Sequence, residues 1–457
     1  MSDRPVVAMF VRNTFQHDAR VRREANTLIE EGFDVTVFAV TNVPDEVGET
    51  SEGRIRIVRV TLPTAVSAFV RLLGRIVGAT ARAASLARRA RRKASGGSKP
   101  QMSPELHTST EQVAYARRPR LVSAADGARR GIRNFLWPAH RFLQGFKYGR
   151  IVGEKAAALK PVAYHCHDLN AILAGFRAKK IHDAPVIYDA HELWPHRNRP
   201  DARKRKTWML ERADGYFSRR ADGVITVNDS IARHMERRYR LGKEVVVVRN
   251  IPSLVARDAP PEHGMLGDLP QPRLVYVGGI QTFRGLEQVI AAMPMIRDAV
   301  FAAIGPGTPE YRAGLEKLAV DTGVADRVRF VEWVPPSSVV PTVAQGDLGM
   351  CLFQASHLSY YWTLPNKFFE YLHAGIPVLA SDFPETRRLV ERYEVGALCD
   401  PGAPASIAAA VNDLLARPDD LARMRDNALK AAQELNWEHE RERMLGLYRR
   451  LVPSMRA

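Results

Sequence analysis

Short runs of apolar residues alternate with amphipathic helical segments along most of the chain, and this alternation constrains the fold more than any other feature. The first run is Val6–Val11, and Asp18 stands where it can cap a helix that ends at Gly32. The inward face of that helix consists of Val21, Ala25, Leu28 and Ile29. Strand alternating with helix predicts a parallel sheet covered on both faces.

The apolar runs fall into two sets on either side of the proline-rich stretch Asp258–Pro272. The first set also contains Val35–Val40, Val186–Tyr188, Gly223–Val227 and Val245–Val248. The second set contains Leu274–Val277, Val300–Ile304, Val328–Phe330, Leu348–Phe353 and Val378–Ser381. Because a chain of 457 residues is too long for one ordinary hydrophobic core, we expect two α/β domains, over residues 1–257 and 258–435. Residues 436–457 form a separate C-terminal helix, with Asn436–Leu451 as its helical stretch.

Cysteine usage and hydropathy indicate the compartment. The three cysteines, Cys166, Cys351 and Cys399, form no CxxC pair, so we interpret them as reduced core thiols. No signal peptide pattern precedes Val6–Val11, and no stretch of 18 apolar residues occurs. We therefore expect a cytoplasmic protein.

The positive charge is concentrated in one insertion. The chain carries a net +17, and Ala65–Arg150 contains 18 Lys/Arg against 3 Asp/Glu. On an ideal helix, one narrow basic stripe would contain Arg71, Arg75, Arg82, Arg89 and Lys93. The roughly opposite side would contain Val66, Phe69, Leu73, Ile76, Val77, Ala84 and Ala87. This pattern predicts a peripheral helix on an anionic membrane surface; a solvated helix or disordered insertion is the alternative. Aromatic residues do not interleave the stripe, so no nucleic-acid partner is expected.

The second half contains three candidate ligand-binding motifs. Gly278 and Gly279 follow an expected strand, and Arg284 stands just before the next helix, where it can pair with phosphate. Lys367 and Glu370 share one face of a short helix that begins near Asn366, where the carboxylate can accept from a ribose diol. The alternatives are a solvated arginine and a surface ion pair. A third motif, containing Gly305 and Gly307, allows close backbone approach to a base or is an ordinary turn.

Polar, titratable residues also end two successive strands of the first half. His167 and Asp168 end the first, and His191 and Glu192 end the second. Their position favours a cleft, although a lone histidine is usually structural. No Asp-x-Asp motif and no other ligand cluster occurs, so we expect no metal and no cofactor.

These motifs together resemble family 4 of the glycosyltransferases, which are retaining enzymes of the GT-B fold. The most specific similarity is Asn-Lys-Phe-Phe-Glu-Tyr at 366–371, followed by Gly-Ile-Pro-Val at 375–378. Further similar stretches are residues 18–32, 167–169, 188–193 and 277–285. The resemblance implies two Rossmann-like domains facing across a cleft, with the C-terminal helix crossing back to the first domain. It also implies metal-independent hexosyl transfer from a UDP-, GDP- or dTDP-sugar to a glycan or lipid-linked acceptor.

The resemblance assigns roles to several of these residues. Glu370 matches the ribose ligand, and His191 matches a histidine near the transferred sugar. The implied donor site contains Gly278, Gly279, Arg284, Gly305, Gly307, Asn366, Lys367 and Glu370, and the implied catalytic residues are His191, Arg284 and Lys367. The implied acceptor side contains Asp18, Arg20, His167, Asp168 and Glu192.

The sequence also departs from the family pattern. Gly279 stands where the family usually has arginine, Arg284 where it has lysine, and Trp362 where it often has a first glutamate. Two alternatives stay open at this point. One is a GT-B epimerase or hydrolase acting on a nucleotide sugar, and the other is a non-catalytic scaffold that binds such a sugar.

Overall fold

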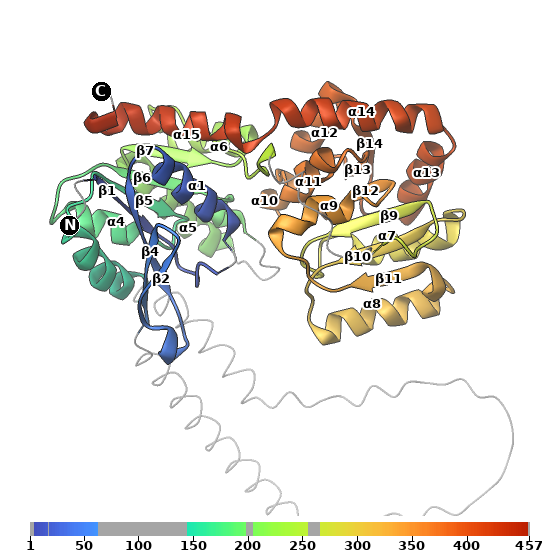
Figure 1. The fold of residues 1–457 in the computed structure, drawn as a ribbon, viewed down its shortest axis with the longest axis horizontal. Helices are drawn as coiled ribbons and strands as arrows, with labels where there is room; N and C mark the ends of the chain where they lie inside the picture. The colour runs from blue at the N-terminus through green and yellow to red at the C-terminus, as the bar shows by residue number, and fades with distance from the viewer. Residues whose placement is uncertain (1–3, 17, 63–143, 198–203, 255–265, 456–457) are drawn as a thin grey trace, which may run out of the picture. The chain divides into compact units, whose positions relative to one another are not determined.

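The computed structural model describes residues 4–16, 18–62, 144–197, 204–254 and 266–455, and within them it contains two parallel-sheet α/β domains (Figure 1). The first sheet has the strand order β3-β4-β2-β1-β5-β6-β7-β8, and only β3 runs antiparallel to its neighbour. Its first four strands are β1 (Val6–Phe10), β2 (Asp34–Val40), β3 (Gly48–Glu52) and β4 (Ile55–Val60). The others are β5 (Ala163–His167), β6 (Val186–Ala190), β7 (Gly223–Thr226) and β8 (Val246–Val247).

Helices connect these strands as the alternation predicts. The labelled helices of the first domain are α1 (Ala19–Glu30), α4 (Ile172–Lys179), α5 (Lys204–Arg220) and α6 (Asp229–Tyr239). Residues 144–157 are also helical, and short 3₁₀ turns lie at Pro44–Glu46 and Trp194–His196. Asp18 caps α1 by accepting from the Val21 amide, and Gly32 follows the helix with a φ of +92°. Both features confirm the helix limits expected from the sequence.

The second sheet is parallel throughout, with the order β11-β10-β9-β12-β13-β14. Its strands are β9 (Arg273–Val277), β10 (Val300–Ile304), β11 (Val328–Val331), β12 (Leu348–Cys351), β13 (Val378–Ser381) and β14 (Gly396–Cys399). One face is covered by α7 (Leu286–Ala292), α8 (Pro309–Asp321) and α13 (Pro404–Leu415), whose apolar residues share a core. The core on the other face includes residues of α9 (Val339–Val343), α11 (Asn366–Ala374), α12 (Pro384–Tyr393) and α14 (Pro418–Glu434).

Each sheet has a point where the strand order reverses. In the first sheet β1 lies between β2 and β5, and in the second sheet β9 lies between β10 and β12. Ligands of open α/β sheets bind beyond the carboxyl ends of the strands at such points. The loops after β1 and β9 are therefore the places to look for a site.

The C-terminal helix α15 (Trp437–Leu451) packs on the first domain, although it follows directly on α14 of the second (Figure 1). Its buried residues Trp437, Met444 and Tyr448 join the core formed by β1, β2 and α1. The Trp437 indole also donates to the Thr27 hydroxyl at 3.0 Å. The expected return of this helix to the first domain is confirmed.

The chain divides into two compact units, of which one contains both sheets and the other is Thr61–Tyr148. The second unit contains nearly all of the expected basic insertion, Ala65–Arg150. Residues 63–143 lie outside the described residues, so the amphipathic helix expected at Val66–Lys93, with its five basic residues, stays a prediction. No helix in the described ranges combines the length and the apolar character needed to cross a bilayer.

Candidate functional site

A cavity of about 610 Å³ opens between the carboxyl ends of the two sheets. From the first domain it is lined by the loop after β1, the start of α1 and the residues after β6 and β7. From the second domain it is lined by the loop after β9, the end of β12, the residues around α10 (Leu358–Tyr361) and the start of α11. We call this cavity the cleft. Its position agrees with the sites expected at the two strand-order reversals.

Two cations from the second domain line the cleft, and both lie against aromatic rings. The Lys367 Nζ is 3.5 Å from the centre of the Tyr276 ring, and the Arg284 guanidinium is 4.4 Å from that of Phe353 and 5.1 Å from that of Tyr360. Among the described residues, neither cation has a carboxylate within ion-pair distance. Cations that are held by rings and lack a carboxylate partner suit an anionic ligand.

Burial changes the charge of the residues at the start of α11. Burial, assisted by the neighbouring Arg284 charge, lowers the pKa of Lys367 to about 7. Burial also raises the pKa of Glu370 to about 7, against the opposing charges of Lys367 and Arg23. Both groups therefore change charge near neutral pH. A diphosphate near Lys367 would favour its charged form.

The structure assigns the expected donor-site glycines to two different places. Gly278 and Gly279 line the cleft, and Gly278 has a φ of +121°. Gly305 and Gly307 do not line it. A Cβ on Gly305 would lie 2.3 Å from the Gly278 carbonyl oxygen, and one on Gly307 would lie 2.9 Å from the Ile280 Cβ. These two glycines thus allow the loops after β9 and β10 to touch, which accounts for them without a bound base.

The first domain contributes Asp18, His191 and Glu192 to the cleft lining. Arg20 reaches the same wall but is 2% exposed, because its guanidinium donates to Asp189 and to the Val248 carbonyl oxygen. Burial raises the pKa of Glu192 to about 7. Of the expected acceptor-side residues, Asp18 and Glu192 thus lie at the surface of the cleft, Arg20 is nearly buried in its wall, and His167 and Asp168 lie outside its lining.

His167 is buried behind the cleft wall, whereas Asp168 is partly exposed but lies outside the cleft lining. His167 is 3% exposed, and its Nδ1 lies 3.1 Å from the Nε2 of His191. An Asp168 carboxylate oxygen accepts from the His191 amide at 3.2 Å. Neither residue lines the cleft, but both contact His191, which does.

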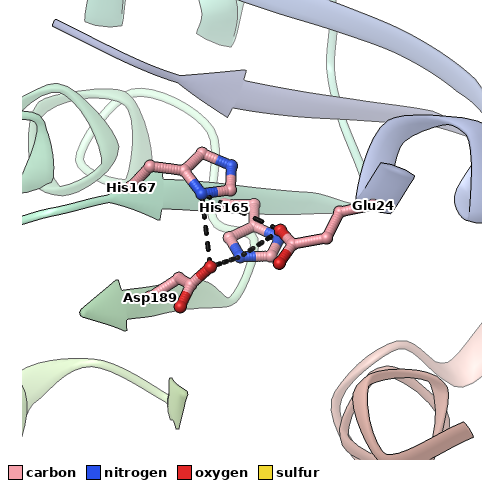
Figure 2. A group of neighbouring side chains, drawn as sticks. All are labelled: Glu24, His165, His167 and Asp189. Atoms are coloured by element: carbon pink, nitrogen blue, oxygen red, sulfur yellow. Dashed lines mark ion pairs between the residues drawn. The ribbon is translucent and has the colours of Figure 1, made fainter. Parts of the chain in front are cut away.

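Figure 2 shows four neighbouring buried side chains, those of Glu24, His165, His167 and Asp189. Two of them, His167 and Asp189, lie 3.1 Å and 3.2 Å from the Nε2 of His191. The four separations between a ring nitrogen and a carboxylate oxygen are 3.3–3.8 Å, which is close enough to share one metal ion. Neither Glu24 oxygen makes a hydrogen bond with a described residue. Arg20 already lies in the group, with its Nε 3.0 Å from Glu24 Oε1 and 3.0 Å from Asp189 Oδ2. A metal ion would share these carboxylates with that cation.

A second group that could ligate a metal consists of His196, Glu211 and His234. The His196 Nε2 is 2.8 Å from Glu211, whose other oxygen pairs with Arg238 at 2.8 Å. These partners hold the carboxylate without a metal. The expectation of no metal stays a prediction for both groups.

Sequence patterns did not predict the position of Trp362 or the aromatic rings that contact the two cations of the cleft. Trp362 does not line the cleft; its ring lies 5.1 Å from that of His234, and its carbonyl oxygen accepts from Asn228 at 2.8 Å. It therefore joins the two domains at a position where the family often has a glutamate. Tyr276 lies within the apolar run Leu274–Val277, so no sequence signal distinguishes it from a core residue, yet its ring contacts Lys367 in the cleft. The three cysteines are free and buried, as expected.

Comparison with known proteins agrees with this geometry. A family model described as Glycosyltransferase Family 4 matches residues 107–251, and one described as Glycosyl transferases group 1 matches residues 271–417. A D-inositol 3-phosphate glycosyltransferase from Thermomonospora curvata is 28% identical over 186 residues, which cover 38% of this chain and 42% of that protein. The match thus spans less than half the length of this curated relative.

Two solved structures show the same fold at low sequence identity. Sucrose-phosphate synthase from Thermosynechococcus elongatus has a TM-score of 0.71 and 18% identity, covering 99% of this chain and 100% of that one. Anabaena HepE, in complex with UDP-glucose, has a TM-score of 0.64 and 13% identity, covering 97% and 98%. Together with the two family matches, these similarities show that the chain belongs to the GT-B glycosyltransferases. Its family 4 match lies in the first domain and its group 1 match in the second.

Proposed function

We propose that this glycosyltransferase transfers a hexose from a nucleoside diphosphate donor bound in the cleft, with retention of the anomeric configuration. The observation that carries the proposal is the pair of ring-supported cations, Arg284 and Lys367, which face the cleft and have no carboxylate partner in the part of the chain that the structure describes. A buried cation without a counter-charge is costly, and a diphosphate supplies that charge. The structural neighbour HepE, which binds UDP-glucose, supports a donor of the UDP-, GDP- or dTDP-sugar class.

The mechanism follows from where charge develops. As the bond between sugar and phosphate breaks, the leaving diphosphate gains negative charge, which Arg284 and Lys367 are placed to stabilise. Glu370, three residues after Lys367 on α11, is proposed to accept from the donor ribose. Asn366 lines the cleft at the start of the same helix and is proposed to contact the donor.

The acceptor is proposed to bind on the first-domain side of the cleft. Asp18 and Glu192 supply carboxylates there, and His191 lies near the transferred sugar. A hydroxyl-rich acceptor can donate to carboxylates, and the departing phosphate would take the proton of its attacking hydroxyl. We propose a glycan or lipid-linked acceptor of the cell envelope, with the enzyme peripheral to the cytoplasmic membrane face. The basic residues between Ala65 and Arg150 support that membrane contact.

Transfer assays test this proposal directly. Radiolabelled UDP-, GDP- and dTDP-sugars are incubated with the full chain and lipid-linked or oligosaccharide acceptors, with and without a chelator. We expect one donor to give a product of unchanged anomeric configuration by NMR, at a rate that EDTA does not alter. Epimerised or hydrolysed donor in the presence of every acceptor would instead favour the nucleotide-sugar epimerase or hydrolase. Binding without turnover would favour the scaffold.

A further inference from the structure

Asp189 is the centre of a buried network behind the cleft wall. Its side chain is fully buried, and its Oδ2 lies 3.0 Å from Arg20 Nε, 3.2 Å from His191 Nε2 and 3.3 Å from His167 Nδ1. Its Oδ1 accepts from Arg20 Nη2 at 2.9 Å. One carboxylate therefore faces Arg20, which is 2% exposed, on one side and His191, which lines the cleft, on the other.

Arg20 fixes the position and the charge of this carboxylate. It binds both Asp189 oxygens, and its remaining Nη1 donates to the Val248 carbonyl oxygen at 2.7 Å. Burial disfavours charge on Asp189, but Arg20 and His191 outweigh it and hold the pKa of Asp189 well below its ordinary value. The aspartate is therefore an anion held rigidly against the imidazole of His191.

The neighbours of Asp189 leave His191 as the group that carries the second positive charge. Burial raises the pKa of Glu24 to about 8, so this carboxyl is neutral at pH 7. Burial lowers the pKa of His167 to about 3, so its ring is neutral, and an unprotonated Nδ1 can accept from His191 Nε2. Burial opposes charge on His191, but Asp189 and Asp168 outweigh it and raise its pKa to about 10.

The other charged or titratable groups near His191 come from three elements of the first domain. They are Asp18, Arg20 and Glu24 from α1 and its cap, His165, His167 and Asp168 from β5 and its end, and Asp189, Glu192 and Arg197 from β6 and the loop that follows it. The pKa of Asp18 is lowered despite burial, because the His191 charge and the hydrogen bonds from Asn13 and the Val21 amide outweigh the cost of burial. Arg20 and His191 thus face the anions Asp189 and Asp18, with Asp168 as a further acidic group and Arg197 as a further cation.

We propose that Asp189 is a positioning residue that holds His191 as a cationic imidazolium, with Nε2 toward Asp189 and Nδ1 left for the cleft. His191 then donates a hydrogen bond to the transferred sugar or the oxygen leaving with phosphate, and it does not serve as a general base. This role in catalysis rests on the proposed glycosyl transfer, but the protonation state of His191 does not. No proton leaves His191 during the reaction, which agrees with the proposed transfer of the acceptor hydroxyl proton to the departing phosphate.

The same network could instead be a metal site, because four ligand atoms of Glu24, His165, His167 and Asp189 lie within reach of one ion. The position of Arg20 argues against it. The guanidinium already binds both oxygens of Asp189 and lies 3.0 Å from Glu24, so an added divalent ion would face a fixed positive charge. A protonated Glu24 satisfies the network without that repulsion.

Ring NMR of histidine in the full chain, without substrate, tests the proposal. The spectrum of 13C-labelled histidine is recorded from pH 5.5 to 9, with His191 assigned from a His191→Gln variant. We expect the His191 ring to stay protonated through pH 8 in the wild type. In Asp189→Asn it should titrate below about pH 7, near the ordinary histidine value. A wild-type His191 that is neutral at pH 7, or an Asp189→Asn variant with the wild-type titration, would overturn the proposal.

Three further variants separate this role from a structural one. Asp214 is also buried in the first domain, where it accepts from Tyr188 and Tyr239, so Asp214→Asn should leave the His191 titration unchanged. Glu24→Gln mimics the protonated carboxyl and should also leave it nearly unchanged. If Asp189→Asn does not fold, because Arg20 is left without its partner, the double variant Arg20→Met with Asp189→Asn removes both charges and should show the same lowered titration.

Metal content and activity complete the test. One equivalent of a transition metal in the purified protein, lost in Asp189→Asn, would overturn the proposal in favour of a metal site. Where transfer is observed, Asp189→Asn should keep its donor KM while its kcat falls at least tenfold between pH 6 and 8, a slope absent from the wild type. If no transfer occurs with any donor but the NMR result holds, the proposed function fails and the assignment of Asp189 stands.

Discussion

Donor binding should depend on pH through Lys367, because burial holds the pKa of this lysine near 7 in the free protein. A diphosphate beside its Nζ restores the charged form, so binding takes up a proton. If the pKa returns to about 10.4 in the complex, about 0.9 proton is taken up per ligand at pH 8. Between pH 8 and 9 the affinity should then fall about ninefold, or about 1.3 kcal/mol.

Donor affinity falls as the pH rises, because the complex holds a proton on Lys367 that the free protein gives up. The raised pKa belongs to the complex, so the affinity that Lys367 contributes is present below pH 7 and is lost as the pH rises above 7. Glu370, with a pKa of about 7, acts in the opposite direction, because its carboxylate form binds ribose. At pH 8 it is already about nine-tenths ionised, so it adds little to the slope above that pH.

Isothermal titration calorimetry with UDP, GDP and dTDP measures both quantities. Titrations at pH 8 and 9, in two buffers of different ionisation enthalpy, give the affinity and the proton uptake. Lys367→Met should bind weakly, with no uptake and a flat profile. Arg284→Gln should bind about 1.5–3 kcal/mol more weakly. It should still lose affinity as the pH rises, but from a somewhat higher pH, because the Arg284 charge helps to lower the pKa of Lys367. Equal affinity at the two pH values, without proton uptake by the wild type, would refute the placement of Lys367 against the diphosphate.

Four further outcomes are expected. Glu370→Gln should weaken nucleotide binding with little change in melting temperature, whereas the reverse pattern in calorimetry and thermal melting would make Glu370 a structural residue. His191→Ala should lower kcat more than nucleotide affinity, and wild-type turnover would contradict its place near the sugar. Gly305 has a φ of +135°, and an added Cβ would lie 2.3 Å from the Gly278 carbonyl oxygen, so Gly305→Ala should lower the free energy of unfolding by about 1–3 kcal/mol in chemical denaturation. Gly314→Ala in α8, where an added Cβ meets no atom within 4 Å, should not. Vesicles rich in phosphatidylglycerol should co-sediment the wild type at low salt, and equal binding after glutamine replaces the basic stripe would disprove membrane docking by that stripe. The stripe variant replaces Arg71, Arg75, Arg82, Arg89 and Lys93.

Much of the fold followed from sequence patterns, because a buried parallel strand is a nearly continuous apolar run. The runs at Val6–Val11 and Val300–Ile304 are strands with almost the expected limits. The hairpin strand Gly48–Glu52 was missed because all five of its residues are exposed and polar or glycine. The edge strand Gly396–Cys399 was missed because its residues, Gly-Ala-Leu-Cys, lack β-branched and aromatic side chains, and three of the four are only partly buried.

The site was only partly predictable, because its wall depends on contacts between distant segments. Lys367, Glu370 and His191 could be identified from local motifs, and the structure places all three in the cleft lining. Asp189 lies 169 residues from Arg20, so no local pattern shows that they pair. Glu24 occupies a helix position that favours neither a ligand nor a core residue by itself, and only the fold brings it beside them.

A thermal-shift comparison tests most directly the claim that a nucleoside diphosphate binds in the cleft. The full chain and an Arg284→Gln, Lys367→Met double variant are melted at pH 7 with UDP, GDP and dTDP, each up to millimolar concentration. We predict that one of the three raises the melting temperature of the wild type in a saturable way and leaves that of the double variant unchanged. No shift of the wild type with any of them, or an equal shift of both proteins, would contradict the account.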